Sequence, residues 1–328
     1  MLRALRPYFI ALLCSWTALI IAALFYSKQH PQFHWIMNEA LPAFLVEAVF
    51  YLASGFNATR AWFARINSRR AQAAILWISA LLPYLIFSLS AETFQRNAFQ
   101  LLAILSAVFA FWYAVLPRRF AYDAGFLIIG AAPILLRVFQ RIYRSPDEHT
   151  RVDVLGHLMW IRVGIAALLV IREWDPGSFS FWPRRDEWKT GILYYVLGVV
   201  PIAALAVGLH DVRFAPLQGE WWRIAAIAIG TFFGILWVVA FGEELFFRGV
   251  VERALLNGWS SPVLAVSISA VLFGAAHLWF HQFPDWRSAV VATVLGIACG
   301  IAYLRSGSVR APMVTHAFVV TTWRVFFR

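Results

Sequence analysis

The segment Phe241–Arg248, with the sequence FGEELFFR, places two carboxylates and a guanidinium inside a long apolar run that begins near residue 224. A charged side chain at bilayer depth costs roughly 2.5–3.5 kcal/mol, so three of them require partners, water or a function. On a helix, Glu244 and Arg248 form an i,i+4 pair, and Glu243 projects about 100° away from Glu244. The apolar pattern continues past Arg248 to about residue 256. This continuation favours a buried polar site over the alternative, a wet ion pair just outside a span that ends near residue 241.

The composition indicates the class of protein. Of the 328 residues, 61% are hydrophobic and 14% are charged, whereas soluble domains are about 45–50% apolar and about 25% charged. We therefore expect an all-α, polytopic transmembrane helical bundle. The net charge of +11 comes mainly from arginines between apolar runs, which is typical of positive-inside loops and not of a face that binds nucleic acid. The two cysteines, Cys14 and Cys299, lie in apolar runs, which argues against a disulfide framework and a cysteine metal site.

Long apolar runs predict about 10–11 transmembrane spans. The candidates are residues 8–26, 40–56, 73–91, 99–116, 124–140, 154–171, 191–209, 224–247 or beyond, 262–281, 288–304 and 311–327. Arginine-rich loops alternate with loops poorer in net positive charge, so the positive-inside rule places the N-terminus in the cytoplasm and the C-terminus outside. Arginine is used far more than lysine, which favours a GC-rich bacterial source and hence the bacterial inner membrane.

A change in composition divides the chain into two bundles. Pro, Gly and Trp mixed with both signs of charge predict an interfacial connector at 173–189. It separates an N-terminal transmembrane bundle at 1–172 from a C-terminal bundle at 190–328. In the first bundle, Glu47 lies in the middle of a predicted span, and we expect it to pair with Arg162 or Arg137 in a structural role.

Histidines recur in the apolar runs of the C-terminal bundle. Phe273 and His277 lie four residues apart on one predicted helix face, beside Gly274 and other small residues that permit close helix approach. His316 lies near the start of the last predicted span. Each histidine alone is typical of a hydrogen-bonded helix contact. Together with the two glutamates, they indicate a desolvated site that positions a water for attack.

At these residues the chain resembles the CPBP family of intramembrane glutamic endopeptidases, which are related to the type II CaaX prenyl protease. The resemblance lies in the motifs Glu243-Glu244-x-x-x-Arg248 and Phe273-x-x-x-His277, and in a third helix that bears His316. It covers about residues 172–328. It implies a helical membrane endopeptidase without nucleotide or covalent acyl-enzyme, and we expect neither a cofactor nor a metal.

The resemblance also implies a role for each residue. Glu243 matches the glutamate that activates the hydrolytic water together with His277. Glu244 and Arg248 complete the motif by orienting that carboxylate. His316 matches the histidine that helps to stabilise the oxyanion.

The third motif departs from the family pattern at one position. The family usually carries Asn or another polar residue four positions after the histidine, where this chain has Val320. An oxyanion donor contributes about 3–4 kcal/mol of transition-state stabilisation, so its loss would matter. Thr321, Thr315 or a backbone N–H is a candidate substitute.

The chemistry of peptide hydrolysis explains why a site would contain carboxylates, histidines and a nearby cation. Water is a poor nucleophile, and a carboxylate desolvated among phenylalanines is a stronger base. A histidine can share the proton or hold the water, and a nearby cation such as Arg248 keeps the carboxylate ionised.

This chemistry requires the motifs to meet in space. If the span ended near residue 247, Glu243 would lie near its inner end, whereas His277 would lie roughly 22 Å along the next span at 1.5 Å per residue. We therefore expect the helix that carries Glu243 to continue past Arg253, and the glutamate and imidazoles to converge.

Three alternatives use these residues differently. Glu243 or Glu244 with His277 and His316 has the ligand types of a His₂Glu zinc site, although the His-Glu-x-x-His arrangement is absent. A non-catalytic membrane scaffold or immunity-type protein would use the bundle to bind another protein, and Val320 favours this reading. A transporter would explain intramembrane charge, but repeats with interrupted helices are not evident.

The resemblance leaves the substrate open, since the family cleaves prenylated proteins, unprenylated membrane peptides and protein-sorting tails. Prenylated CaaX proteins are not expected in bacteria. We therefore expect the partners to be the lipid bilayer and a membrane peptide or a protein tail with a transmembrane segment, and no nucleic acid.

Overall fold

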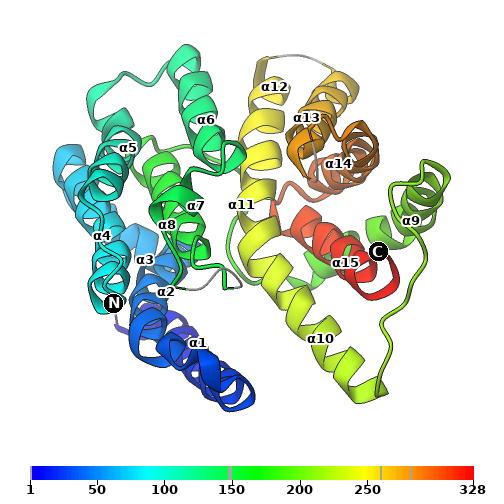
Figure 1. Ribbon diagram of the computed structural model, residues 1–328. Coiled ribbons are helices and arrows are strands. Elements are labelled where there is room, and N and C mark those ends of the chain that lie inside the picture. The colour runs from blue at the N-terminus through cyan, green and yellow to red at the C-terminus, as the bar shows by residue number, and fades with distance from the viewer. Residues whose placement is uncertain (1, 147–149, 259–260, 281–282) are drawn as a thin grey trace. The chain divides into compact units, whose positions relative to one another are not determined.

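The computed structural model describes residues 2–146, 150–258, 261–280 and 283–328. Within these residues all regular elements are helices (Figure 1), which confirms the predicted all-α fold. The chain divides into two compact units, Met1–Trp174 and Asp175–Arg328. The division lies inside the stretch 173–189 that the composition marks as a connector.

Nine helical segments of the described residues are long and apolar enough to cross a bilayer, as expected of an integral membrane protein. They are Arg3–Gln29, Pro31–Gly55, Arg69–Ser90, Arg96–Val115, Val154–Ile171, Arg185–Gly208, Trp221–Gly258, Pro262–Trp279 and Trp286–Ser306. The other two predicted spans correspond to shorter helices, α6 (Phe120–Leu135, 16 residues) and α15 (Arg310–Phe326, 17 residues). The chain turns after α6 at Arg137, whose backbone has φ = 53°, so the helix predicted at 124–140 is interrupted.

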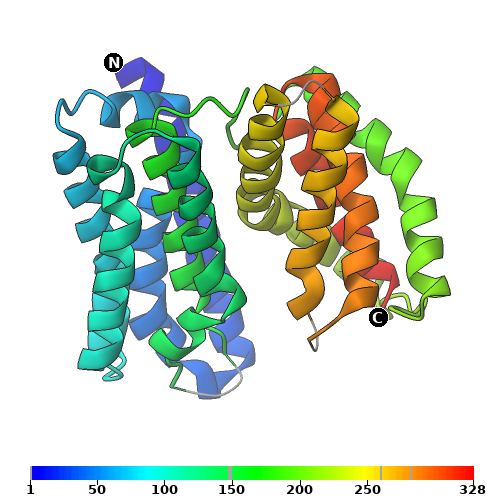
Figure 2. The ribbon, with the colours of Figure 1, turned by 90° about the horizontal axis from the view of Figure 1, so that it is seen from above.

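The first unit is built from helices that run up and down (Figure 2). Its elements are α1 (Leu2–Gln29), η1 (Pro31–Phe33), η2 (Ile36–Ala40), α2 (Leu41–Gly55), α3 (Asn57–Phe63), α4 (Arg69–Ser90), α5 (Arg96–Val115), α6, α7 (Val138–Ile142), α8 (Val154–Ala166) and η3 (Ala167–Ile171).

A buried ion pair ties three helices of this unit together. Nε of Arg162 on α8 donates to Oε1 of Glu47 on α2 at 2.7 Å, and both side chains are buried. Nη1 and Nη2 of Arg162 donate to the hydroxyl and the carbonyl oxygen of Ser79 on α4, at 2.9 and 2.8 Å. The predicted pairing of Glu47 with an arginine is therefore confirmed, with Arg162 as the partner.

The second unit contains the candidate site. Its elements are α9 (Arg185–Gly208), α10 (Trp221–Gly234), η4 (Ile235–Val239), α11 (Ala240–Glu244), η5 (Leu245–Glu252), α12 (Arg253–Gly258), α13 (Pro262–Ala276), η6 (His277–Trp279), α14 (Trp286–Ser306) and α15. The helix α14 packs against α13, α15 and α9, and α15 also packs against α10 and α11.

A single long helical rod organises the second unit. The elements α10, η4, α11, η5 and α12 follow one another over the 38 residues Trp221–Gly258 and appear as the yellow rod of Figure 1. The helix therefore continues past Arg253, as predicted from the separation of Glu243 and His277 along their spans. Glu243 lies near the middle of the rod.

Candidate active site

The two adjacent glutamates lie in a short α-helical stretch of the rod. This stretch, α11, is preceded by the π-helical segment η4 and followed by the π-helical segment η5. π-helical segments are rare, and they frequently occur at functional sites. The irregularity therefore coincides with the predicted motif.

Glu244 holds His316 across the helix interface between α11 and α15. Nδ1 of His316 lies 2.7 Å from Oε1 of Glu244, and both side chains are buried. A carboxylate oxygen accepts hydrogen bonds, so Nδ1 of the ring carries the hydrogen and donates it to an ionised Glu244. A neutral His316 then has its lone pair on Nε2. The contact therefore sets both the orientation and the tautomer of the imidazole.

Arg248 compensates the buried charge of Glu244. Its Nε lies 3.2 Å from Oε2 of Glu244, and neither side chain is exposed. Its Nη2 donates to the carbonyl oxygen of Gly296 on α14 at 2.9 Å, and its guanidinium lies 4.7 Å from the ring centre of Phe273. The predicted i,i+4 pair is therefore present, and it is buried rather than wet.

Glu243 faces the other nitrogen of the same imidazole. Its Oε2 lies 3.9 Å from Nε2 of His316, which is longer than a direct hydrogen bond. Its side chain is 38% exposed, whereas its Oε2 is buried and has no hydrogen-bond partner among the described residues. Of the two carboxylates, Glu243 is the one whose side chain is partly exposed at the surface of the protein. The resemblance implied that Glu244 and Arg248 orient Glu243, but their contacts go to His316 and to the α14 backbone instead.

His277 lies at the junction of α13 and η6, where its ring contacts Phe273. Its Nδ1 lies 2.9 Å from the carbonyl oxygen of Phe273, which accepts, so a neutral His277 also has its lone pair on Nε2. The ring of Phe273 contacts both imidazoles, with centroid distances of 4.8 Å to His277 and 5.7 Å to His316. Within the described residues, His277 makes no hydrogen bond or ion pair to either glutamate. The structure thus brings four of the five predicted residues together, and His277 joins them through the ring of Phe273.

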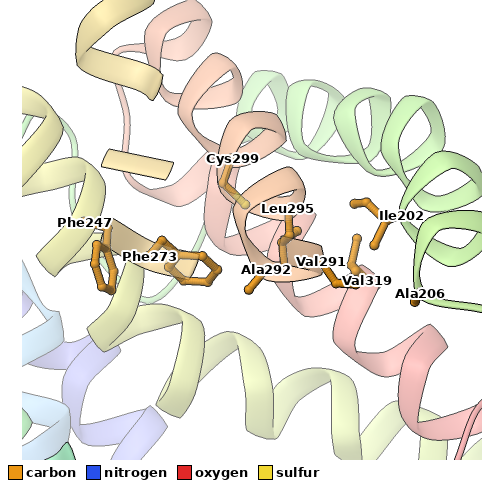
Figure 3. Packing of buried hydrophobic residues seen from close by; sticks show 9 residues of the cluster. All are labelled: Ile202, Ala206, Phe247, Phe273, Val291, Ala292, Leu295, Cys299 and Val319. Carbon is orange, nitrogen blue, oxygen red and sulfur yellow. The ribbon is translucent and has the colours of Figure 1, made fainter. Parts of the chain in front are cut away.

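Close packing of α13 against α14 positions Phe273. A Cβ atom built on Gly274 would overlap Oγ1 of Thr293 and would lie 2.5 Å from the carbonyl oxygen of Ala289, so only glycine fits at this crossing. The predicted close approach at Gly274 is confirmed. Figure 3 shows Phe273 beside Phe247 in the buried cluster of this unit. The cluster comprises Ile202, Ala206, Phe247, Phe273, Val291, Ala292, Leu295, Cys299 and Val319.

Contacts with α9 fix the part of α15 that carries His316. Nη2 of Arg310 donates to Oε1 of the buried Glu187 at 2.7 Å. The hydroxyl of Thr315 donates to the carbonyl oxygen of Gly191 at 2.9 Å. Glu187 and Arg310 are not evident as site-supporting residues from the sequence, because both lie in charged stretches that are typical of loops.

Because position 320 carries valine instead of a polar residue, another side chain would have to donate the additional hydrogen bond to the oxyanion. Val320 lies one helical turn after His316, on the same face of α15. Thr315 already donates its hydroxyl to Gly191. The hydroxyl of Thr321 is buried and has no hydrogen-bond partner in the described part of the chain. Thr321 is therefore the candidate whose hydroxyl is uncommitted.

A further buried carboxylate, Glu252, was also missed. It is fully buried at the end of η5, four residues after Arg248 and eight after Glu244. The signal was present, since Glu252 continues their four-residue spacing. It was overlooked because the motif ends at Arg248.

The described residues contain no group of three or more His, Cys, Asp or Glu side chains placed to hold a metal ion. The ligand types of a His₂Glu site are present, but His277 is separated from the others.

Comparison with known proteins gives one match. Residues 225–322 match the family model described as Type II CAAX prenyl endopeptidase Rce1-like. No curated protein and no solved structure matches the chain. The matched range contains all five predicted site residues, and the family indicates a function of the intramembrane peptidase kind. Over this region, the chain is similar to the Rce1-like family of type II CAAX prenyl endopeptidases, which agrees with the resemblance that its three motifs predicted.

Proposed function

We propose that this protein is a glutamate-dependent intramembrane endopeptidase that hydrolyses a peptide bond in a membrane-associated protein or peptide. The observation that carries the proposal is the position of His316, which has the buried Glu244 at one ring nitrogen and the partly exposed Glu243 at the other. The family match supports the same class of reaction.

Glu243 is the proposed general base. Its side chain is partly exposed, which makes it the carboxylate at which we place the hydrolytic water. A positioned base of this kind contributes about 10²–10⁴-fold in rate. His277, with a lone pair on Nε2, is the proposed partner that holds the water.

His316 is the proposed oxyanion donor. The ionised Glu244 stabilises a ring that carries both protons, and Arg248 balances the charge of Glu244. Nε2–H of the doubly protonated ring can donate to the carbonyl oxygen as water attacks the carbonyl carbon. When the C–N bond breaks, the proton that Glu243 took from water passes to the leaving amine.

We further propose that the substrate is an unprenylated peptide or a protein tail with a transmembrane segment. The alternation of arginine-rich loops supports a cytoplasmic N-terminus in a bacterial inner membrane. The lipid bilayer is the medium in which enzyme and substrate meet.

The test compares the C-termini of membrane proteins in cells that produce the wild type or Glu243→Gln. We expect at least one protein to lose a cleaved C-terminus in the variant. Glu220→Gln, at an exposed glutamate just before α10, is the matched control and should leave cleavage intact. Catalysis at this site is excluded if Glu243→Gln and His277→Ala both fold and both leave every cleavage product unchanged.

Metal analysis of the purified protein, with a chelator added to the cleavage reaction, distinguishes the zinc-dependent version. The glutamate mechanism predicts activity that survives the chelator. Loss of activity that zinc restores would favour Glu243 or Glu244 with the two histidines as ligands.

A non-catalytic scaffold is the second candidate, and the apolar Val320 at the usual polar position is the observation that favours it. This alternative predicts that Glu243→Gln retains the cellular phenotype and the binding of a partner protein.

A further inference from the structure

An apolar groove lies in the second unit between α9 and the C-terminal end of α15. Its volume is about 520 Å³, within the range of about 300–1,000 Å³ that is typical of ligand sites. One wall is a stripe of aliphatic side chains on α9, in which Val199, Ala203 and Val207 follow one another every four residues. At 1.5 Å per residue, this stripe is about 12 Å long. The groove is therefore elongated along α9.

The lining of the groove is suited to hydrocarbon. The wall that faces α9 includes Phe214, Thr322 and Phe326. Among the described residues that line the groove, only Thr322 is polar, and its hydroxyl shares a hydrogen bond with the hydroxyl of Tyr195 at 3.0 Å. An extended peptide would leave its backbone N–H and C=O groups unsatisfied there, which is costly. An aliphatic chain carries no such groups.

Two arginines lie opposite each other at one end of the groove. The backbone N–H of Arg213 donates to the carbonyl oxygen of Arg328 at 2.8 Å, and the N–H of Arg328 donates to that of Arg213 at 3.0 Å. Beside this pair, Phe214 and Phe327 form an antiparallel bridge, and both line the groove. Residues that exchange both hydrogen bonds are directly opposite, so the two arginine side chains project from the same side of the ribbon.

The charges of this arginine pair are not compensated within the described part of the chain. Both residues are exposed, and neither guanidinium forms an ion pair or a hydrogen bond there. Asp211, two residues before Arg213, accepts a hydrogen bond from the hydroxyl of Ser288 instead. Like charges directly opposite each other repel, so an anion between the two guanidiniums would stabilise the pair. The pair lies just beyond the C-terminal ends of α9 and α15, where lipid headgroups are expected.

We propose that the groove and the arginine pair form a binding site for an anionic phospholipid, with an acyl chain in the groove and the phosphate between Arg213 and Arg328. A hydrocarbon chain joined to a negative headgroup matches the two parts of the site in their observed order. Arginine binds phosphate through parallel N–H groups. A zwitterionic lipid adds an ammonium group that the pair repels, so the site selects lipids of net negative charge. The inference does not depend on peptidase activity.

The experiment measures lipid binding by native mass spectrometry. The full-length protein, purified in detergent and depleted of lipid, is titrated with phosphatidylglycerol or with phosphatidylcholine of the same acyl chains. We expect one phosphatidylglycerol to bind about 10-fold or more tightly than phosphatidylcholine. The double variant Arg213→Gln/Arg328→Gln should bind phosphatidylglycerol about 30-fold more weakly, because both contacts to the phosphate are lost. The matched control is Arg223→Gln, at an exposed arginine at the start of α10, which should leave the affinity unchanged.

A second variant tests the groove itself. Ala203→Trp places an indole in the groove and leaves both arginines in place. It should weaken the binding of phosphatidylglycerol about 10-fold or more, because the acyl chain loses its contacts with α9. Ile229→Trp, at an exposed position of α10 outside the groove, is the control and should bind as the wild type does. Thermal unfolding curves establish that the variants fold.

Several results would overturn the inference. Equal affinities of the wild type for the two lipids would show that the arginine pair does not select the headgroup. An unchanged affinity for phosphatidylglycerol in the double arginine variant, or in Ala203→Trp, would place the lipid elsewhere. A wild-type dimer that Ala203→Trp converts to a monomer would assign the groove to a second copy of the chain. The wild-type preference and Ala203→Trp keep the test decisive if the double arginine variant does not fold.

Discussion

Nδ1 of His316 lies 2.7 Å from Oε1 of Glu244, although the two residues are 72 positions apart and belong to different helices. The orientation of the imidazole therefore depends on a buried carboxylate, and the charge of that carboxylate is in turn balanced by Arg248. A substitution at Glu244 should therefore affect both the stability and the proposed activity, whereas a substitution at Glu243 should affect the proposed activity alone.

Glu244→Gln and Glu243→Gln should therefore differ in stability. Glu244→Gln leaves Arg248 without its buried ion partner and should lower the free energy of unfolding by about 3–5 kcal/mol. Glu243 is partly exposed, so Glu243→Gln should change it by less than about 1 kcal/mol. Unfolding of both variants in the same detergent measures the difference. Equal losses would contradict the assignment of the structural role to Glu244.

Thr321→Val and Val320→Asn test the missing polar residue of the third motif. If the uncommitted hydroxyl of Thr321 serves as oxyanion donor, Thr321→Val should lower kcat by about 10²-fold or more, with little change in KM. Val320→Asn should then raise kcat in the Thr321→Val background. Thr315→Val is the control, because it removes the bond to Gly191 and should cost stability, by about 1 kcal/mol, more than rate. An unchanged kcat in Thr321→Val would rule out Thr321 as the donor.

The buried pair of Glu47 and Arg162 tests whether the first unit uses its charges only for structure. Each single variant, Glu47→Leu or Arg162→Met, should lower the free energy of unfolding by about 3–5 kcal/mol, because it leaves one buried charge unpaired. The double variant should recover most of the loss, since the charge and its partner are removed together. Chemical unfolding measures all three. A double variant that folds normally but no longer cleaves the substrate would assign the pair a function beyond structure.

Gly274→Val tests the helix crossing that positions Phe273. The added side chain meets Thr293 and the α14 backbone, so we expect a destabilisation of about 1–3 kcal/mol and a loss of activity as Phe273 moves. The matched control is Gly230→Ala on α10, where a Cβ atom has no neighbour within 4 Å. This control should be neutral or slightly stabilising. A stable and active Gly274→Val would show that the crossing tolerates a wider separation.

Much of the fold was predictable because the signals are local. A run of about 20 apolar residues specifies a spanning helix wherever it occurs, since no water is present to satisfy an open backbone. Glu243, Glu244 and Arg248 could be singled out for the same reason, because a charge inside such a run is costly. The length of α6 could not be predicted in this way, since the left-handed backbone at Arg137 ends the helix inside an apolar stretch.

The sequence by itself determined the class of fold and the set of polar residues available for chemistry. Only the tertiary structure decided that His316 pairs with Glu244, that Glu243 remains accessible, and that His277 meets the site across Phe273. These outcomes depend on how far each helix is rotated and how closely it crosses its neighbours, and contacts such as the one at Gly274 set both. The sequence pattern shows on which face of its own helix a side chain lies. It does not show which residues of other helices, distant in the chain, that side chain contacts.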